Sequence, residues 1–590
     1  MIRLSSRSLL ILIWLLSLVL IQPTQSASPP SLVPRQPTTP LTIITVTTAV
    51  DEFALNNTCS LREAVYAAVH DAAIDACAAG AVNDSISLPA DTYTLTRTGA
   101  LEDSGLFGDL DITGTLQLTG ATSATTIING NGTDRIFDIF SGNVTLTHLT
   151  LRNGTVELTG GAVQLRSGAL TVDQTTFEHN RVKTNSDREN TYGGAIHNPA
   201  GTLTVLRSVF AANAADSSYM DYSGLGGVVY NGATSTTTFV DSVVKDTVQY
   251  YSTQTIFNTG SLTVSNSVFM HNPVPIWNNN SGIALVEATQ FFTNTAPAIL
   301  NAGEITINDS EIAFTDISPS GFYCSYGGAL NNRGQAEIKR TFIHDNVTEY
   351  GSGVASSGST SIRDSAIIGN RAPNLARGRE DCAGEGAGIY VSSGSLHIEN
   401  STIADNWAEY TGAGIYSGYF ASQTIITNTT IVSNYSDLNH PFIGHDAPPT
   451  TDAGGIYASK PITITNSLIA HNSSWLSPDA SDCEGALVSA NSLILAPTSS
   501  CTFTATNSLI GIEPLLGTLA DHGGNTLTYN LLPGSPAIDA GALNGCPAHD
   551  QRGINRPQDG DGSNGAQCDI GAYEYVAEPE YAIYLPYLRK

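Results

Sequence analysis

The sequence predicts an all-β fold: a single-stranded right-handed parallel β-helix with an N-terminal capping helix and a small C-terminal domain. Three observations lead to this prediction. A degenerate phrase recurs in register along the chain, as at Thr202–Asn213, Ser261–Asn272 and Ser395–Asn406. Short β-branched runs alternate with polar residues inside each copy, and Gly, Asn and Ser stand at the corners. A single copy is too short to bury an apolar face alone, so the copies are expected to stack into a solenoid.

The chain begins with the pattern of a secretory signal peptide over residues 1–26. Arg3 and Arg7 precede an apolar run at 9–21, and small residues follow as a cleavage site. Residues 27–42 are a Pro/Ser/Thr-rich linker. We therefore expect a secreted, extracellular or cell-surface protein without a membrane-spanning segment in the mature chain. A retained membrane anchor is the alternative, which the shortness of the apolar run disfavours.

Residues 43–110 are predicted to cap the N-terminal end of the solenoid. Ser60 and Glu63 form a capping box, in which a hydroxyl and a carboxylate satisfy the first free amides of a helix. The helix should run to about Asp71. Its apolar face should cover the exposed end of the first coil, and consists of Leu61, Ala64, Val65, Ala68 and Val69.

Residues 111–510 should form the coils of the β-helix. Each copy contains an alternation such as Leu203 and Val205, which is typical of a half-buried strand. A short second strand follows, and its central residues, such as Phe210, Phe269 and Ile403, should share one inward column. About twelve coils spaced about 4.8 Å apart would give a body roughly 60 Å long. A β-propeller is the alternative fold, disfavoured because its blades need regular tight hairpin turns.

Polar residues close each coil at two places. The first is a corner between the two strands, where Asn and Asp tolerate the left-handed backbone region and stacked amides can bond along the axis. These corners are Gln174, Arg207, Asp241, Asn266, Asp309, Arg340, Asp364, Asn400, Asn428, Asn466 and Asn507. The second is the asparagine that ends each copy, at Asn180, Asn213, Asn272, Asn294, Asn346, Asn370, Asn406, Asn434 and Asn472. Histidines close to these asparagines are expected at the surface: His179, His271, His344 and His471.

The eight cysteines fall into neighbouring couples, which an exported protein could use as disulfides. The couples are Cys59/Cys77, Cys324/Cys382, Cys483/Cys501 and Cys546/Cys568, although spacing alone leaves the connectivity open. A bond between Cys59 and Cys77 would fix the capping helix to the first coils.

The chain is strongly acidic, with a formal net charge of −28 from 25 Lys and Arg against 53 Asp and Glu. This charge opposes nucleic-acid binding and adhesion to anionic membranes. Carboxylates can bind calcium ions, and Asp559, Asp561 and Ser563 place oxygen ligands at alternate positions. That segment lacks the glycine and the glutamate of a complete calcium loop, so a plain Asp/Gly turn is the alternative.

Three groups of motifs resemble known families. Cys59–Ala64 (CSLREA), with the following Ile86–Leu95, is similar to the CSLREA-type N-terminal domain of exported bacterial β-helix proteins. The GGAI and FxxN phrases resemble the repeats of polymorphic outer-membrane proteins, which are adhesins. Within residues 511–575, Gly534–Gly541, Asp550–Gly553 and Asp569–Glu574 resemble the choice-of-anchor Q domain, and residues 576–590 follow as a tail. Together the resemblances imply a pectin-lyase-like β-helix at a bacterial surface, and no agreed biochemical activity.

An aromatic stripe is predicted along one outer face. In the GGAI phrase the branched residue should point inward and the next residue outward, beside the longest insertions of the solenoid. The predicted glycan-binding residues of this stripe are His197, Tyr230, Phe257, Trp277, Tyr390, Tyr416 and Tyr457. Aromatic faces combined with acidic and amide groups suit sugar rings. The alternative is that these aromatics merely favour strands and stack on one another.

The function that these patterns predict is non-catalytic binding of a polysaccharide or a cell-surface glycan, as in an adhesin. A polysaccharide lyase or glycoside hydrolase of the pectin-lyase-like fold is one alternative, and a passive structural surface component is another. An enzyme would need carboxylates or basic groups from the insertions. Candidates are Arg377, Arg379, Glu380, Asp381, Glu385, His445, Asp446 and Asp452, although solvated loop charges are the simpler interpretation.

Overall fold

The computed structural model describes residues 42–99, 102–184, 189–216, 224–248, 254–317, 324–374, 384–437, 453–478, 481–562 and 565–577. All of these residues belong to one compact unit, Leu41–Lys590. The expected signal peptide, residues 27–41 of the linker and residues 578–590 of the tail lie outside the described residues.

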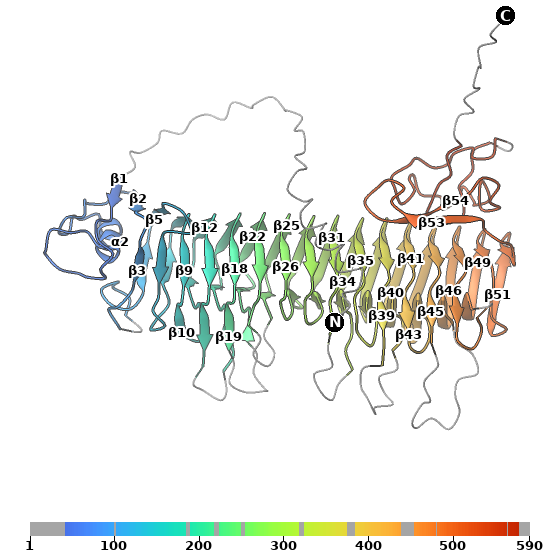
Figure 1. The fold of residues 1–590 in the computed structure, drawn as a ribbon, viewed down its shortest axis with the longest axis horizontal. Helices are drawn as coiled ribbons and strands as arrows, with labels where there is room; N and C mark the ends of the chain where they lie inside the picture. Colours follow the sequence, from blue (N-terminus) through green and yellow to red (C-terminus); the bar gives the residue numbers. More distant parts are fainter. Residues whose placement is uncertain are drawn as a thin grey trace, which may run out of the picture. The chain divides into compact units, whose positions relative to one another are not determined.

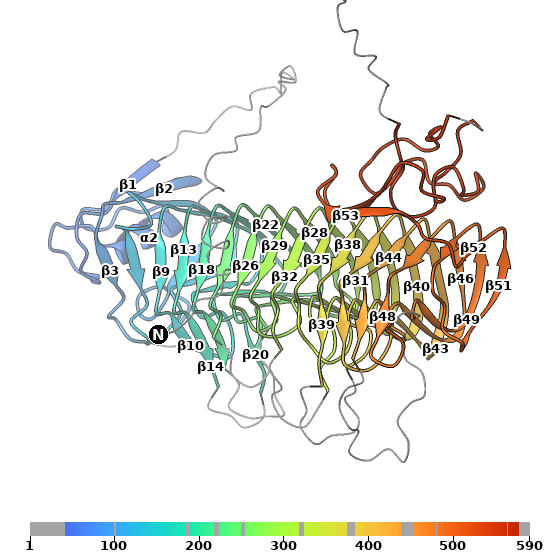
Figure 2. The ribbon, with the colours of Figure 1, turned by 45° about the vertical axis from the view of Figure 1, so that its right-hand side comes forward.

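The structure confirms the predicted fold class, an all-β parallel β-helix with a capping helix. Within the described ranges, the coils build one sheet of 27 strands and one of 16 strands (Figures 1 and 2). The larger sheet contains two ladders, which merge in the long strands near its C-terminal end. Three ladders therefore stack along the solenoid. The 16 strands exceed the number of coils that the sequence predicted, because the first coils lack the recognisable phrase.

The first ladder carries the GGAI-type phrases. Its strands are β4 (Leu110–Thr113), β7 (Phe137–Ser141), β11 (Val163–Leu165), β16 (Ile196–Asn198), β21 (Val229–Asn231), β24 (Ile256–Asn258), β27 (Ile276–Asn278), β30 (Ile299–Asn301), β33 (Leu330–Asn332), β36 (Val354–Ser356) and the first parts of β40 (Ile389–Glu399), β43 (Ile415–Thr427), β46 (Ile456–Thr465) and β49 (Cys483–Ala490).

The second ladder contains the alternating runs. Its strands are β1 (Thr42–Thr45), β2 (Asn83–Leu88), β5 (Thr115–Gly120), β8 (Asn143–Thr147), β12 (Ala169–Asp173), β17 (Thr202–Leu206), β22 (Thr236–Val240), β25 (Ser261–Ser265), β28 (Ile283–Glu287), β31 (Glu304–Asn308), β34 (Gln335–Lys339), β37 (Ser359–Arg363), the later parts of β40, β43, β46 and β49, and β51 (Cys501–Thr506).

The third ladder is the 16-stranded sheet. Its strands are β3 (Thr92–Thr94), β6 (Ile127–Asn129), β9 (Thr150–Arg152), β13 (Thr176–Glu178), β18 (Val209–Ala211), β23 (Val243–Lys245), β26 (Val268–Met270), β29 (Gln290–Phe292), β32 (Glu311–Ala313), β35 (Phe342–His344), β38 (Ala366–Ile368), β41 (Thr402–Ala404), β44 (Thr430–Val432), β47 (Leu468–Ala470), β50 (Leu493–Ile494) and β52 (Leu509–Ile510).

Short strands accompany these ladders. They are β10 (Thr155–Glu157), β14 (Arg181–Lys183) and β19 (Ala214–Asp216); β15 (Thr191–Tyr192) and β20 (Gly224–Leu225); β39 (Arg371–Ala372), β42 (Trp407–Ala408), β45 (Tyr435–Ser436) and β48 (Ser473–Ser474); and the antiparallel pair β53 (Leu516–Ala520) and β54 (Thr528–Leu531).

The core is a continuous apolar column inside the coils. Phe210, Phe269 and Ile403 lie at the centres of β18, β26 and β41 and are fully buried, as predicted. Every predicted corner residue has a left-handed backbone, with φ between 44° and 53°. Asn and Asp reach this region at little cost, which explains their frequency at these corners.

Two buried amide ladders run along the axis, and the sequence predicted the residues of only one. The predicted closing asparagines form the first: the Asn406 carboxamide accepts from the Asn370 amides and donates to Asn434 at 2.9 Å. The second joins Asn198, Asn231, Asn258, Asn278, Asn301 and Asn332. Axial amide bonding was predicted at the corners, and it occurs there in part. Asn466 donates to Asn428 at 3.4 Å and Asn400 bonds Asp364, while Asn428 and Asn466 also donate to the C-terminal domain.

The capping helix is confirmed. Helix α2 (Leu61–His70) begins at Ser60 with the predicted capping box, and Asp71 ends it in the left-handed region. Its buried face contains Leu61, Ala64, Val65 and Ala68. The Cys59–Cys77 disulfide forms, as do Cys483–Cys501 and Cys546–Cys568. Cys382 lies outside the described residues, so its pairing with Cys324 stays a prediction.

The C-terminal segment folds back onto the third ladder, which the sequence did not predict (Figure 1). Leu531, Ala537 and Ile570 pack against Val432 and Leu468 of the solenoid. Most residues of the motifs at 534–541, 550–553 and 569–574 are buried, whereas Gly534 and Gly553 are exposed. Its buried charges pair as Arg552 with Asp550 and Arg556 with Glu574, and Gln551 accepts a hydrogen bond from Thr402 of β41.

Candidate functional site

One outward-facing position of the first ladder forms an unbroken column, here called the outer column. Cα register pairs its members from coil to coil, in the order Asp111, Asp138, Gln164, His197, Tyr230, Phe257, Trp277, Leu300, Asn331, Ala355, Tyr390, Tyr416, Tyr457 and Glu484. Seven of these are the predicted stripe residues. Sequence reasoning missed Asp111, Asp138, Gln164, Ala355 and Glu484. The strands of Asp111, Asp138 and Glu484 lack the GGAI phrase that marked the position, whereas the phrase before Gln164, GGAV at 160–163, was overlooked.

The predicted outward orientation holds, with one correction on accessibility. His197, Tyr230, Trp277, Tyr390, Tyr416 and Tyr457 are half-buried on the outer face, whereas their branched neighbours in the strands are fully buried. Phe257 is only 6 % exposed, because it packs between Tyr230 at 5.7 Å and Trp277 at 5.3 Å between ring centroids. It therefore supports its neighbours and offers little surface to a ligand.

A second line of side chains flanks the outer column. Residues that directly precede the glycines of the GG phrases contribute Tyr192, Tyr326, Tyr350 and Glu385. The turn needs glycine: Gly193 has φ 66°, and a Cβ there would lie 2.3 Å from the carbonyl oxygen of Ile196. Only Glu385 was a sequence candidate. The three tyrosines could have been identified from the sequence, because each directly precedes the first glycine of its phrase.

The aromatic rings form two clusters with different geometry. In the C-terminal cluster, Tyr390, Tyr416 and Tyr457 stack at 5.0 and 4.9 Å, with interplanar angles of 19° and 11°. Their faces cover one another, so the solvent meets mainly ring edges and hydroxyls. In the N-terminal cluster, Phe257 stacks on Tyr230 at 12°, but Trp277 is turned 78° from Phe257. Trp277 is thus the ring that leaves the stack.

Glu385 lies among these tyrosines and is not the solvated loop charge that the sequence suggested. Burial raises the pKa of Glu385 to about 7. Burial, and next the negative charge of Glu385, raise the pKa of Tyr390 and Tyr416. A carboxyl group that is half-protonated near neutral pH can both donate to and accept from a sugar hydroxyl. The other loop candidates, from Arg377 to Asp381 and from His445 to Asp452, lie outside the described residues.

The N-terminal end of the outer column is polar and strongly charged. Both Asp138 oxygens accept from arginines, Arg135 at 2.6 Å and Arg166 at 2.7 and 2.9 Å. Gln164 bonds the Nδ1 atom of His197 at 2.9 Å. Burial, and next the positive charge of Arg135, lower the pKa of His197 to about 4, so this histidine is neutral at physiological pH.

Two further expectations concern histidine and calcium. His344, expected at the surface, is only 9 % exposed, because it lies inside β35, two residues before Asn346. Its ring bonds Asp345 and Glu311. Asp559 and Asp561 do lie close together, joined by Asp539, with their carboxylate oxygens within 4.8 Å. Asp539 uses both oxygens on the backbone amides of Gly560, Asp561 and Gln567, and Ser563 lies outside the described residues. Calcium binding there stays a prediction.

Comparisons with known proteins add little beyond the geometry. No family model and no curated protein matches the chain. Solved structures that align with it include a PL6-family polysaccharide lyase of Pseudopedobacter saltans, with 10 % identity, coverage of 73 % of this chain and 90 % of that one, and a TM-score of 0.32. A PL6 alginate lyase in complex with a trisaccharide has 11 % identity, coverage of 77 % and 86 %, and a TM-score of 0.33. The A-module of the Azotobacter vinelandii mannuronan C-5 epimerase AlgE6 has 13 % identity, coverage of 73 % and 91 %, and a TM-score of 0.30.

TM-scores this low carry no inference about activity or substrate, so the assignment of the fold rests on the strand pairing itself. In the described part of the chain, no helix is long and apolar enough to cross a membrane.

Proposed function

We propose that this chain is an exported, surface-associated β-helix that binds glycans without catalysis, along the outer column. The observation that carries the proposal is the register of that column. It places one outward side chain on every coil, and coils repeat about every 4.8 Å. That spacing is close to the length of one pyranose unit in an extended glycan, so a chain lying along the axis would meet one side chain per sugar.

The two aromatic clusters would contribute in different ways. Trp277, turned out of its stack, can offer a ring face to the apolar C–H face of a sugar. The stacked Tyr390, Tyr416 and Tyr457 offer a row of hydroxyls instead, with Glu385 as a neighbouring acceptor. The acidic surface favours neutral or cationic glycans over polyuronates unless cations intervene.

The test is a glycan array with the purified mature chain, followed by titration of any ligand found. Trp277→Ala removes a ring face, and the triple variant Tyr390→Phe, Tyr416→Phe, Tyr457→Phe removes hydroxyls while preserving the stack. Thr238→Ala with Thr263→Ala is the matched control, since these residues face outward on the second ladder. We expect tenfold or greater loss of affinity in one of the first two and none in the control. Equal affinity in all of them would contradict the proposal.

Glu385 is the observation that favours a second candidate, a glycan-cleaving enzyme. A general acid works best with a pKa near the operating pH, and burial brings the pKa of Glu385 to about 7. Enzyme function predicts that Glu385→Gln abolishes turnover while leaving binding nearly intact. An absorbance assay for new unsaturated ends and a reducing-end assay, run on each bound glycan, separate lyase, hydrolase and pure binding.

A further inference from the structure

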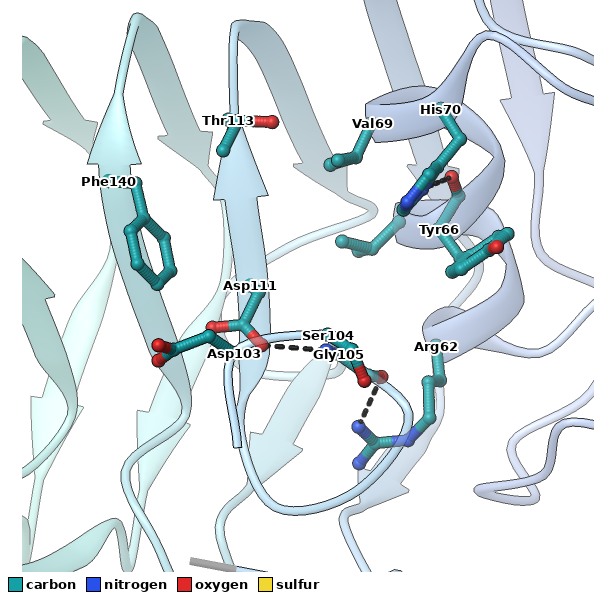
Figure 3. A pocket seen from close by; sticks show the side chains of 11 residues that line it. Arg62, Tyr66, Val69, His70, Asp103, Ser104, Gly105, Asp111, Thr113 and Phe140 are labelled. Atoms are coloured by element: carbon teal, nitrogen blue, oxygen red, sulfur yellow. Dashed lines mark hydrogen bonds between the residues drawn. The ribbon is translucent and has the colours of Figure 1, made fainter. Parts of the chain in front are cut away.

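A cavity of about 190 Å³ lies between the capping helix and the first strands of the outer column (Figure 3). Tyr66 and Val69 of α2 and the ring of Phe140 give it apolar walls, whereas Asp103 and Asp111 add carboxylates. Figure 3 shows the side chains of Asp103 and Asp111 lying next to each other beside the loop that contains Gly105. The cavity therefore has an apolar side and a side with two neighbouring carboxylates.

Three carboxylates converge at this place. Asp103, Asp111 and Asp138 each offer one oxygen, and these oxygens lie within 4.8 Å of one another. The three residues come from separate segments: the loop before β4, β4 itself and β7. Strand register holds Asp111 and Asp138 side by side on neighbouring coils. Like charges at this distance repel one another unless a positive charge lies between them.

Asp111 has an orphaned oxygen. The side chain is only 8 % exposed, and its Oδ2 accepts from the Gly105 amide at 2.6 Å. Its Oδ1 is buried and has no hydrogen-bond partner. A buried carboxylate oxygen without a donor is costly, and pairing with a cation or coordination of a metal is the usual remedy.

The nearby arginines leave Asp111 without a cationic partner. Arg166 bridges Asp103, at 3.2 Å, and Asp138, at 2.7 Å, and Arg135 contacts Asp109 and Asp138. Arg62 is engaged by Asp51 and by the carbonyls of Gly105, Gly108 and Asp109. Asp138 keeps one spare lone pair, on Oδ1, because Oδ2 already accepts from both arginines whereas Oδ1 accepts only from Arg166.

We propose that Asp103, Asp111 and Asp138 form a calcium site that joins the N-terminal cap to the first coils. Calcium takes oxygen ligands at 2.3–2.6 Å, so oxygens on opposite sides of the ion lie about 5 Å apart, which matches the spread of these three. Magnesium needs a tighter shell, and zinc prefers nitrogen and sulfur. Water would complete the shell from the cavity. Asp111 and Asp138 also belong to the outer column, but calcium binding can be measured without a glycan, so the inference does not rest on the proposed function.

The test uses terbium as a luminescent calcium substitute and calorimetry with calcium itself. Tyr66 lines the cavity and should sensitise terbium emission. We expect calcium to displace terbium and to raise the melting temperature of the mature chain. Asp111→Asn, close in size but uncharged, should lose one calcium equivalent or at least tenfold in affinity. Magnesium should bind at least tenfold more weakly than calcium.

Two controls make the outcome decisive. Asp561→Asn changes the acidic group in the C-terminal domain, and should leave the Tyr66-sensitised signal unchanged. Tyr66→Phe should remove that signal while calorimetry still detects calcium. If Asp111→Asn fails to fold, Asp103→Asn serves instead, since the Asp103 side chain is 63 % exposed. Unchanged calcium affinity in a folded variant of Asp111 or Asp103 would overturn the proposal, as would the absence of calcium binding to the mature chain.

Discussion

Replacement of Asn406 by Ala tests whether the buried amide ladder stabilises the solenoid. The Asn406 side chain donates to the carbonyl of Ile367 at 3.0 Å and to Asn434 at 2.9 Å. It accepts from the backbone and side-chain amides of Asn370, each at 3.0 Å. Alanine removes these four bonds and leaves the buried Asn370 amide without this acceptor. One orphaned buried donor costs about 1–3 kcal/mol, and the lost bonds add to it, so we expect a destabilisation of about 3 kcal/mol.

The assay is urea unfolding of the mature chain, combined with hydrogen exchange of β38, β41 and β44. Protection should fall first in the coils beside residue 406, since each coil contacts only its neighbours. Asn280→Ala is the matched control, because Asn280 is exposed and should change stability by less than about 0.5 kcal/mol. If Asn406→Ala unfolds at the same urea concentration as Asn280→Ala, the amide ladder does not stabilise the fold and the reasoning fails.

Three further predictions concern other parts of the chain. Burial raises the pKa of Asp482, the carboxylate that ends the amide ladder, to about 6. The folded chain therefore holds this proton longer than the unfolded chain, and stability should fall by up to roughly 3 kcal/mol as pH rises from about 4 to above 6. Asp482→Asn should flatten that part of the urea-midpoint profile; an unchanged slope would argue against it. Asn266→Val places a β-branched residue at φ 47° and should cost about 1–3 kcal/mol in thermal melts, whereas Asn266→Gly should be nearly neutral. Ile570→Asp buries a charge under the C-terminal domain, so limited proteolysis should release that domain while residues 111–510 stay protected; equal protease resistance would refute the docking.

Periodicity predicted the solenoid because each coil repeats the same physical constraints. The inward column must be apolar, as Phe210 and Phe269 are, and the corner must tolerate a left-handed backbone, as Asn266 does. Both constraints appear as recurring letters. The capping box at Ser60 and Glu63 was equally local, because a helix start is encoded within four residues.

Contacts between distant segments were not predictable in the same way. Nothing local in Ile570 marks Leu468 as its neighbour, so the docking of the C-terminal domain was missed. The acidic end of the outer column was missed for a related reason. Asp111 and Asp138 occupy the same register as Trp277, but their coils lack the phrase that made the register visible. His344 was misplaced because it lies two residues before Asn346, inside β35, whereas His179, His271 and His471 directly precede their asparagines with a left-handed backbone.

The binding site should lie among the residues of each coil that the fold itself does not require. Inward residues pack in the core, corner residues adopt the left-handed backbone, and the two asparagine ladders form axial hydrogen bonds. Outward residues of the third ladder are partly committed as well, because the C-terminal domain covers Val432 and Leu468.

The second ladder faces outward with small polar residues such as Thr204, Thr238 and Thr263. The first ladder brings rings, amides and carboxylates into one register along its length, whereas the third ladder does so over shorter stretches, as at Gln290, Glu311 and Phe342. Its rings form two clusters, and carboxylates stand at both ends of the column, at Asp111 and Glu484. Selection for folding alone does not require Trp277 to turn out of its stack or Glu385 to lose solvent among tyrosines. These departures from the repeat are where ligand recognition should be sought first.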